Sequence, residues 1–137
     1  EILYRVLQGP HGWMLREIAA PDSAMARVNQ AIQWIRRDFA ESIRVEHMAE
    51  KAAMSVSAFH RHFKAVTTLS PLQYQKRVRL LQARTLMVAN ARSVTAAAFE
   101  VGYESSTQFS RDYAKVFGLP PSRDAARIQH ESKVLRV

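Results

Sequence analysis

The sequence contains no cysteine, and this absence limits the chemistry that the chain can perform. Disulfide bonds, thiolate nucleophiles and cysteine-based zinc sites are all excluded, so packing alone must stabilise the fold. No apolar run approaches the roughly 20 residues that a membrane-spanning helix needs, and the chain does not open with a signal peptide. We therefore expect a soluble, cytoplasmic protein without a membrane partner.

Sequence signals of catalytic or metal sites are also missing. The chain has no glycine-rich phosphate loop and no serine-nucleophile elbow. His60 and His62 are two residues apart, which places them on different faces of a helix and argues against shared metal ligation. Asp112 and Glu104 do not make a catalytic pair without a pocket that perturbs them. We therefore predict no enzymatic activity, no catalytic residue, no metal and no cofactor.

Two tryptophans, Trp13 and Trp34, are further candidates for a ligand site. A single tryptophan beside an apolar stripe is, however, typical of a core or of an interface between domains. We therefore interpret both as packing positions.

Acidic residues are absent from Lys51 to Phe99, although the whole chain carries twelve of them. This stretch holds eight of the twenty lysines and arginines, which leaves twelve cations against twelve acids elsewhere. The formal net charge of +8 therefore arises in the middle of the chain. Such a positive field suits a polyanion, and the displaced counterions would make binding strongly salt-dependent. A solvated basic face without a partner would have the same composition.

Hydrophobic periodicity predicts a helical protein whose first regular helix follows Asp22. The segment Ile2–Ala20 is interrupted by Gly9–Pro10–His11–Gly12 and has no assignable fold. Pro21–Asp22–Ser23 is typical of a helix start. The apolar stripe of the helix that follows consists of Met25, Val28, Ala31, Ile32, Ile35 and Phe39.

Two segments of the chain repeat one another, first at a spacing of 49 residues and then at 50. Each has a four-point helical stripe, a short turn, a serine that can cap a helix, and a second helix. The stripes are Val45, Met48, Ala49 and Ala52, and Val94, Ala97, Ala98 and Val101. The paired positions after the turn include Ser55 and Ser105, Phe59 and Phe109, Arg61 and Arg111, Phe63 and Tyr113, and Val66 and Val116. In the first unit the buried side of the second helix would consist of Phe59, Phe63 and Val66. Helix, turn and helix predict two helix-turn-helix units, at about 45–66 and about 94–117.

A longer helix is predicted between these units. Ser70 followed by Pro71 marks its start, because a proline at the first helical position loses no hydrogen bond. The helical pattern continues to about Val88. Apolar residues cover much of its circumference, so we expect it to be packed between two bodies; they are Val78, Leu80, Leu81, Ala83, Leu86 and Met87.

The outer face of each second helix is the candidate functional site. Each face carries short polar residues near the helix start and an arginine further along. In the major groove an arginine can bind guanine O6 and N7 together, while serine and threonine accept several bases. We predict that DNA is contacted by Ser57, His60, Arg61 and Lys64 of the first unit and by Ser106, Thr107, Ser110 and Arg111 of the second.

The segment from about Ile43 to Pro121 resembles the DNA-binding domain of the AraC family of bacterial regulators. The resemblance rests on Met54–Lys64 and Ser70–Tyr74, and above all on Val101–Ser105 with Phe109–Arg111 and Phe117–Pro121. It implies an all-α fold of seven helices, in which a central linker helix joins two homeodomain-like helix-turn-helix subdomains. The two recognition helices would enter neighbouring major grooves on one face of the DNA.

The resemblance also implies a layout for the chain. The AraC-type domain would occupy residues 21–130, followed by a C-terminal tail at 131–137. Because the chain opens with Glu1 in place of methionine, we expect residues 1–20 to be the remnant of an upstream effector or dimerisation domain. The implied partners are double-stranded DNA, RNA polymerase and an unknown small-molecule effector bound by the missing N-terminal domain. The family leans toward activation, so we expect an activator.

The chain departs from the family pattern in three places. Ala53 and Thr68 stand in the first unit where the family often has glycine. After Pro121 the family commonly has an aromatic residue and an arginine, which this chain lacks; Arg123 and Arg127 are the substitutes for a phosphate contact there.

Two other functions fit the same residues. A basic helical module for an acidic protein partner would bind duplexes weakly and without dependence on their length. A DNA-targeting part of a larger enzyme would require a catalytic domain upstream of Glu1. The duplicated arginine and cap positions favour DNA over the first alternative, since a protein partner has no reason to demand two equivalent units.

Overall fold

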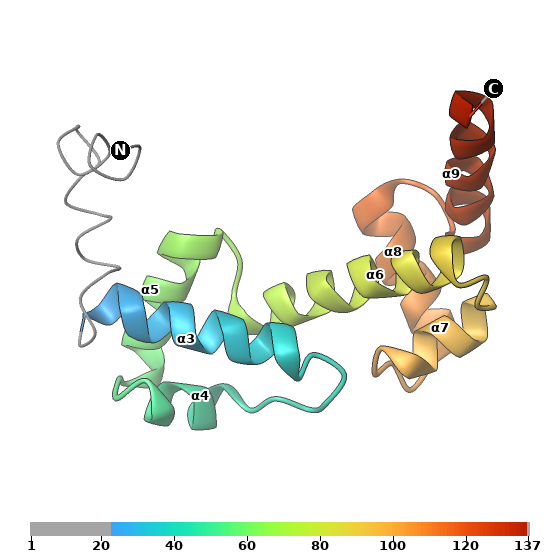
Figure 1. The fold of residues 1–137 in the computed structure, drawn as a ribbon. Coiled ribbons are helices and arrows are strands. Elements are labelled where there is room, and N and C mark those ends of the chain that lie inside the picture. The colour runs from blue at the N-terminus through green and yellow to red at the C-terminus, as the bar shows by residue number, and fades with distance from the viewer. Residues whose placement is uncertain (1–22, 137) are drawn as a thin grey trace, which may run out of the picture. The chain divides into compact units, whose positions relative to one another are not determined.

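The structure is a computed structural model that describes residues 23–136. The predicted upstream remnant, residues 1–20, lies outside the described residues. Between residues 23 and 136 the chain forms seven α-helices and no strand, which confirms the predicted all-α fold. The helices, drawn in Figure 1, are α3 (Ala24–Arg37), α4 (Val45–Lys51), α5 (Val56–Thr67), α6 (Pro71–Ala89), α7 (Val94–Glu100), α8 (Ser106–Phe117) and α9 (Pro121–Arg136).

The chain divides into two compact units. The first contains α3, α4, α5 and the first turn of α6, which ends at Tyr74. The Tyr74 hydroxyl accepts a hydrogen bond from Arg36 Nε at 2.9 Å, and its ring meets Phe63 edge-on. The second unit contains residues 38–42, α6 from Gln75 onward, and α7 to α9. Helix α6 thus runs without a break from one unit into the other, as predicted for the linker helix.

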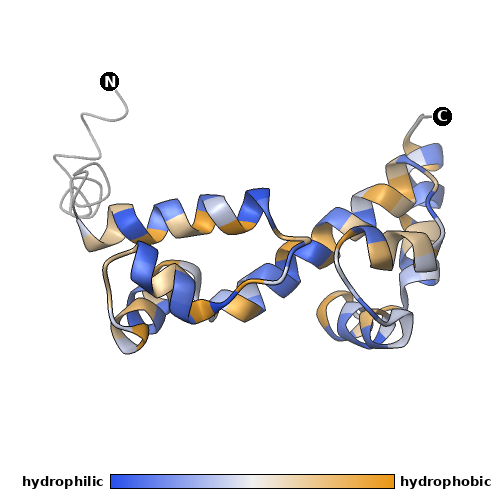
Figure 2. Ribbon diagram, turned by 90° about the horizontal axis from the view of Figure 1, so that it is seen from below, coloured by the Kyte–Doolittle hydropathy of each residue, from blue (hydrophilic) through white to orange (hydrophobic). Residues whose placement is uncertain are grey.

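The core of the first unit is made from one face of each of its three full helices. Figure 2 shows that hydrophobic and hydrophilic residues share every helix. The aromatic pair of α5, Phe59 and Phe63, is fully buried as predicted. Val66 was predicted to join this pair, but it is 39% exposed because it lies on the last turn of α5, beyond the core. The buried cluster consists of Val28, Ala31, Ile32, Ile35, Met48, Ala49, Ala52, Phe59 and Phe63.

The prediction that Phe39 continues the stripe of α3 is wrong. Helix α3 ends at Arg37, and the half-buried Phe39 packs against the core of the second unit. Polar side chains of α6 hold this segment in place: Gln75 Nε2 donates to the carbonyls of Phe39 at 3.0 Å and Glu41 at 2.7 Å. Arg79 donates to the same two carbonyls at 2.6 and 3.1 Å. These hydrogen bonds override the helical periodicity.

The core of the second unit repeats this plan with α6, α7 and α8. It consists of Leu80, Ala83, Met87, Ala97, Ala98, Val101, Phe109 and Tyr113. Leu81, one of the apolar residues predicted on α6, lies outside this core and is 46% exposed.

The two predicted helix-turn-helix units are confirmed and closely matched in length. Helices α4 and α7 have seven residues each, and α5 and α8 have twelve each. The predicted caps form: Ser55 Oγ accepts from the Ala58 amide at 3.1 Å, and Ser105 Oγ accepts from the Gln108 amide at 3.2 Å. The extra residue of the second unit lies in its turn, which changes the repeat spacing from 49 to 50.

The turns of the first unit adopt left-handed backbone conformations without glycine. Ala53 has φ 55° and Thr68 has φ 65°, at the positions where the second unit has Gly102 and Gly118. Each non-glycine residue in this region costs about 1–2 kcal/mol. The departures from the family pattern therefore lower stability and leave the helices in place.

Helix α9 extends through most of the segment that we separated as a C-terminal tail. It continues to Arg136, because no glycine or proline follows Pro121 and ion pairs support the helix. Arg127 pairs with Asp124 at 2.7 Å and with Glu131 at 3.0 Å, the spacings that face each other on a helix. None of the described helices is long and apolar enough to span a bilayer.

A buried carboxylate joins α9 to α6 and α8. Asp124 is fully buried, and its Oδ2 accepts hydrogen bonds from Tyr113 Oη at 2.6 Å and Arg84 Nε at 2.9 Å. Its Oδ1 accepts from Arg127 Nη2 at 2.7 Å. The Arg84 guanidinium also lies over the Phe117 ring, 3.9 Å from its centroid. The last turns of α8 are therefore held in place by hydrogen bonds to a buried carboxylate and by packing against Arg84.

These hydrogen bonds set the ionisation of the cluster. Burial by itself would raise the pKa of Asp124, but bonds from Tyr113, Arg127 and Arg84 outweigh it and hold the pKa below its ordinary value. Burial, and then the bond to Asp124, raise the pKa of Tyr113 to about 12. The carboxylate is ionised and the phenol neutral at pH 7.

Gly102→Ala is expected to lower the free energy of unfolding by about 3 kcal/mol, through left-handed strain and overpacking. Its Cβ would lie 2.4 Å from the Ala40 carbonyl oxygen, at a position where φ is +105°. Gly118→Ala is the control, because its φ is +83° but nothing lies within 4 Å of a Cβ. It should cost only about 1 kcal/mol. Urea denaturation followed by circular dichroism measures both, and equal losses would contradict the close approach of Ala40.

Asp124→Asn is expected to lower the free energy of unfolding at pH 7 by about 3 kcal/mol, because it leaves partly buried cations without their counter-ion. In the wild type this contribution should be complete above pH ~4, the ordinary pKa of aspartate, and lost as the pH falls through the lower pKa of the folded state.

Urea denaturation across the acid range tests this. The Asp124→Asn chain should lose that part of the acid dependence, whereas Glu104→Gln, which changes an exposed acid, should keep both the stability and the pH profile of the wild type. An unchanged acid profile in Asp124→Asn would show that the carboxylate is not the titrating group.

Candidate nucleic-acid interface

The four predicted residues of α5 lie on one exposed helix face. Ser57, His60, Arg61 and Lys64 are all exposed, and their spacing of three and four residues places them on one side of the helix. Phe59 and Phe63 are buried on the other side. Burial of the aromatic pair therefore fixes which side of α5 a partner can reach.

The structure also brings together the four predicted residues of α8. Ser106, Thr107, Ser110 and Arg111 line one shallow surface hollow, together with Ala114 and Pro120. Thr107 and Arg111 are exposed, while the two serines are half-buried. The hollow thus combines hydroxyl groups with one guanidinium, the donors and acceptors that a base edge can meet.

The beginnings of both recognition helices are electrostatically suited to an anion. Neither α5 nor α8 has an acidic residue in its first turn. The amides of a first helical turn carry a partial positive charge, which favours a nearby phosphate.

Asp112 has a role in positioning α8 that the sequence did not predict. Asp112 is buried, where it accepts hydrogen bonds from Tyr103 Oη and Gln108 Nε2, each at 2.9 Å. Lys76 Nζ of α6 lies 3.5 Å from the same carboxylate. Burial and the bond to Asp112 raise the pKa of Tyr103. The sequence signal was an acid within the apolar stripe of α8, next to Tyr113.

Half of the cations in the acid-free stretch are engaged inside the second unit. Lys76 pairs with Asp112, Arg84 with Asp124 and Arg92 with Glu100, while Arg79 binds backbone carbonyls. Their partners lie outside the stretch, so the charge count along the sequence overstated the positive charge that is free for a partner. Within residues 23–136, the exposed cations without an ion-pair partner on the recognition helices are Arg61, Lys64, Arg111 and Lys115.

The two substitutes for a phosphate contact after Pro121 differ in their surroundings. Arg127 is held by Asp124 and Glu131, whereas Arg123 is exposed on the first turn of α9. His60 is exposed and His62 half-buried, as expected from their spacing. Across the described part of the chain, no three histidine, aspartate or glutamate residues are grouped in a way that could hold a metal.

Comparison with known proteins places the chain in a family. A model of a helix-turn-helix domain family matches residues 48–127. The HTH-type transcriptional activator RhaS of Escherichia fergusonii is 38% identical over 96 residues, which make up 70% of this chain and 34% of that protein. The chain thus spans about a third of the length of this curated relative.

Solved structures agree with this assignment. A probable AraC family transcriptional regulator from Rhodopseudomonas palustris is 31% identical, with a TM-score of 0.67 over 74% of this chain and 96% of that one. The DNA-binding domain of AdpA, solved in complex with a target DNA, is 27% identical, with a TM-score of 0.70 over 76% of this chain and 94% of that one. This chain belongs to the AraC family of helix-turn-helix transcription regulators.

Proposed function

We propose that this chain reads DNA sequence with α5 and α8, which enter neighbouring major grooves, and that the regulator to which it belongs is an activator. The observation that carries the proposal is the equivalence of two exposed helix faces, with Arg61 and Arg111 at matching positions fifty residues apart. RhaS is named as an activator, and the AdpA domain was solved on a target DNA. Both support the proposal.

The contacts divide by chemistry. Arg61 and Arg111 suit bidentate binding of guanine, and the hydroxyls of Ser57, Ser106, Thr107 and Ser110 suit several bases. His60 lies beside Arg61 on the same face. Lys64 is a point charge one turn further along α5, which suits a phosphate.

The rest of the predicted layout is proposed on the same basis. Residues 21–130 would form the DNA-binding domain, and a longer protein would supply the domain that binds a small-molecule effector. RNA polymerase is the proposed protein partner of an activator. An acidic protein partner is disfavoured, since α5 and α8 each present two exposed cations that have no ion-pair partner among the described residues, on two equivalent helices. The relatives are transcription regulators, which disfavours a DNA-targeting part of an enzyme.

Arg111→Ala is expected to weaken binding to a specific duplex by about 1–3 kcal/mol and to relax the base preference at one position. The duplex would first be selected from a random pool and then used in gel-shift titrations. Arg111→Lys is the matched variant, because it keeps the charge but removes the planar fork that binds two acceptors. It should lose base preference as Arg111→Ala does. If Arg111→Lys keeps both affinity and preference, Arg111 contacts a phosphate.

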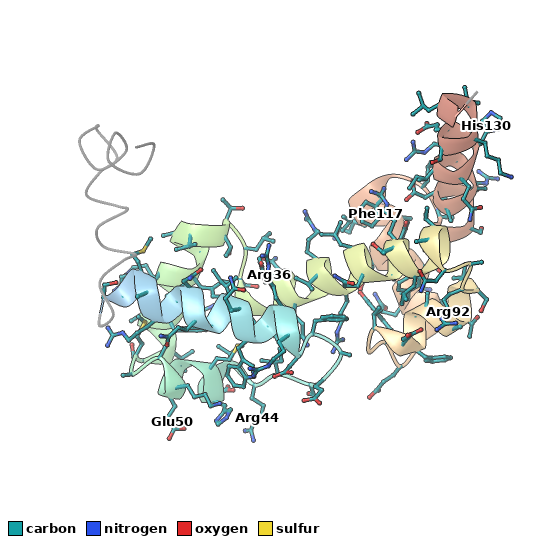
Figure 3. The ribbon with its side chains drawn as sticks, viewed as in Figure 1. Arg36, Arg44, Glu50, Arg92, Phe117 and His130 are labelled. Carbon is teal, nitrogen blue, oxygen red and sulfur yellow. The ribbon has the colours of Figure 1, made fainter. Side chains whose placement is uncertain are left out.

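Binding should weaken with added salt, with a slope set by the cations that are free to contact DNA. The four exposed cations of α5 and α8, each counted as displacing one counterion, predict a slope of about −3.6 in log affinity against log salt, or a loss of roughly a hundredfold between 50 and 200 mM. Lys64→Ala should reduce the slope by about 0.9. Arg92→Ala should change the slope little, because Arg92, which is labelled in Figure 3, is already paired with Glu100 at 3.1 Å. A flat salt dependence would remove the electrostatic part of the proposal.

A further inference from the structure

The first unit contains a pocket that the recognition face does not use. It has a volume of about 320 Å³, near the lower end of the range for small-molecule sites. No residue of α5 lines it. Its lining residues are Arg27, Gln30, Ala31, Trp34 and Arg37 of α3, and Met48, Lys51 and Ala52 at the end of α4.

The polar part of the pocket is entirely cationic or neutral. Three of the eight lining residues are lysine or arginine, and none is aspartate or glutamate. The like charges of Arg27 and Lys51, gathered in a concave and partly apolar site, repel one another more than they would in water, and an anion relieves that repulsion.

Arg27 has a buried hydrogen-bond donor without a partner among the described residues. Its Nε atom is buried and has no acceptor among the described residues. A buried donor left without a partner destabilises the folded chain. An oxygen acceptor in the pocket would bind the Arg27 guanidinium, and the Arg27 side chain would turn so that the buried Nε–H also donates to it.

In the second unit, the position that corresponds to Arg27 has a hydrogen-bond acceptor. The buried residues of α3 and α6 correspond at a spacing of 52, for example Val28 with Leu80 and Ala31 with Ala83. The same spacing matches Arg27 with Arg79. The Nε of Arg79 donates to the Phe39 carbonyl at 2.6 Å, so there the position has an oxygen acceptor.

The surroundings of Arg27 and Arg79 also differ in charge. Lys51 at the end of α4 corresponds to Glu100 at the end of α7, at the repeat spacing of 49. Glu100 pairs with Arg92, whereas Lys51 Nζ lies over the Trp34 ring, 4.1 Å from its centroid. The end of α4 in the first unit is therefore more positively charged than the end of α7 in the second.

The other half of the pocket is apolar. Met48, Ala31 and Ala52 are buried, and Trp34 is half-buried beside them. Trp34 packs against the core, as the sequence predicted, and also lines the pocket. An occupant therefore needs an apolar body as well as an anionic group.

We propose that this pocket binds a small organic anion. A carboxylate or phosphate group would accept from Arg27 and lie near Lys51, and the apolar body would lie against Trp34 and Met48. The site is placed at the last turn of α4, directly before Ala53 and the turn into α5.

Fluorescence titration of the chain carrying Trp13→Phe tests the proposal, because Trp34 is then the only tryptophan. The probes are benzoate and phenyl phosphate as anions with an apolar ring, benzamide as the neutral analogue, and inorganic phosphate as the anion without one. At constant ionic strength, benzoate or phenyl phosphate should shift the Trp34 emission saturably, with a Kd at or below about 1 mM. Benzamide and inorganic phosphate should each bind at least tenfold more weakly, whereas equal binding by either would overturn the pairing of charge with an apolar surface.

Arg27→Gln should weaken binding of the anionic probe at least tenfold. Arg44→Gln is the matched control, because Arg44 is exposed, lies outside the lining, and points away from the helices in Figure 3. The NMR signal of the Arg27 Nε–H group should shift on titration in the parent chain. If Arg27→Gln does not fold, Lys51→Gln serves as the second variant and should weaken binding severalfold.

The same variants separate this site from the DNA interface. Arg27→Gln should bind the selected duplex as the parent chain does. The absence of saturable binding by either ring anion, equal binding by Arg27→Gln, or a loss of DNA affinity in that variant would each overturn the proposal. The last result would assign these cations to the DNA backbone.

Discussion

Burial of two aromatic rings on each recognition helix governs the rest of the structure. Phe59 and Phe63 are fully buried on α5, as are Phe109 and Tyr113 on α8. A twelve-residue helix with one buried face has only one orientation about its axis, so the residues on the opposite face are exposed together. The predicted DNA-contacting residues on each helix therefore depend on packing that none of them takes part in.

The two units secure this orientation by different means. In the first, packing acts almost alone, and Ala53 and Thr68 lie in left-handed conformations that glycine would adopt more easily. In the second, glycines occupy both positions, and two buried carboxylates, Asp112 and Asp124, tie α8 to α6 and α9. Such ionic networks do not add much stability when compared with an apolar core, but removing one member leaves a charge uncompensated. The orientation of α8 is thus fixed by more interactions than that of α5.

Local patterns predicted the elements of this fold well. Periodicity located α3 to α8 but not α9, serine caps located the starts of α5 and α8, and the repeat aligned both helix-turn-helix units to the residue. Each of these signals lies within a few turns of one helix, where sequence spacing determines spatial proximity. The eight candidate DNA-contacting residues fall on two exposed faces for the same reason.

Long-range partners could not be predicted in the same way. Arg84 and Asp124 are forty residues apart, as are Arg79 and Phe39, and nothing in the local sequence connects them. A count of charges along the chain consequently treated Arg84 as available for a polyanion, and periodicity alone placed Phe39 in α3. Both errors arise because a polar side chain of α6 is satisfied by a segment from elsewhere in the fold.

A comparison of α3 in the first unit with α6 in the second shows how long-range partners change the role of matching residues. At the spacing that aligns their buried faces, Ile32 of α3 corresponds to Arg84 of α6. Ile32 completes an apolar core, whereas Arg84 reaches the buried carboxylate of Asp124. Arg27 and Arg79 are identical residues at matching positions, yet only Arg79 has its Nε acceptor within the described chain. The repeat therefore preserves the helices and their exposed faces. The polar side chains of α3 and α6 on the inner side of the two units, in contrast, have different hydrogen-bond partners. This difference leaves the pocket beside Arg27 in the first unit, where we propose that an anion binds.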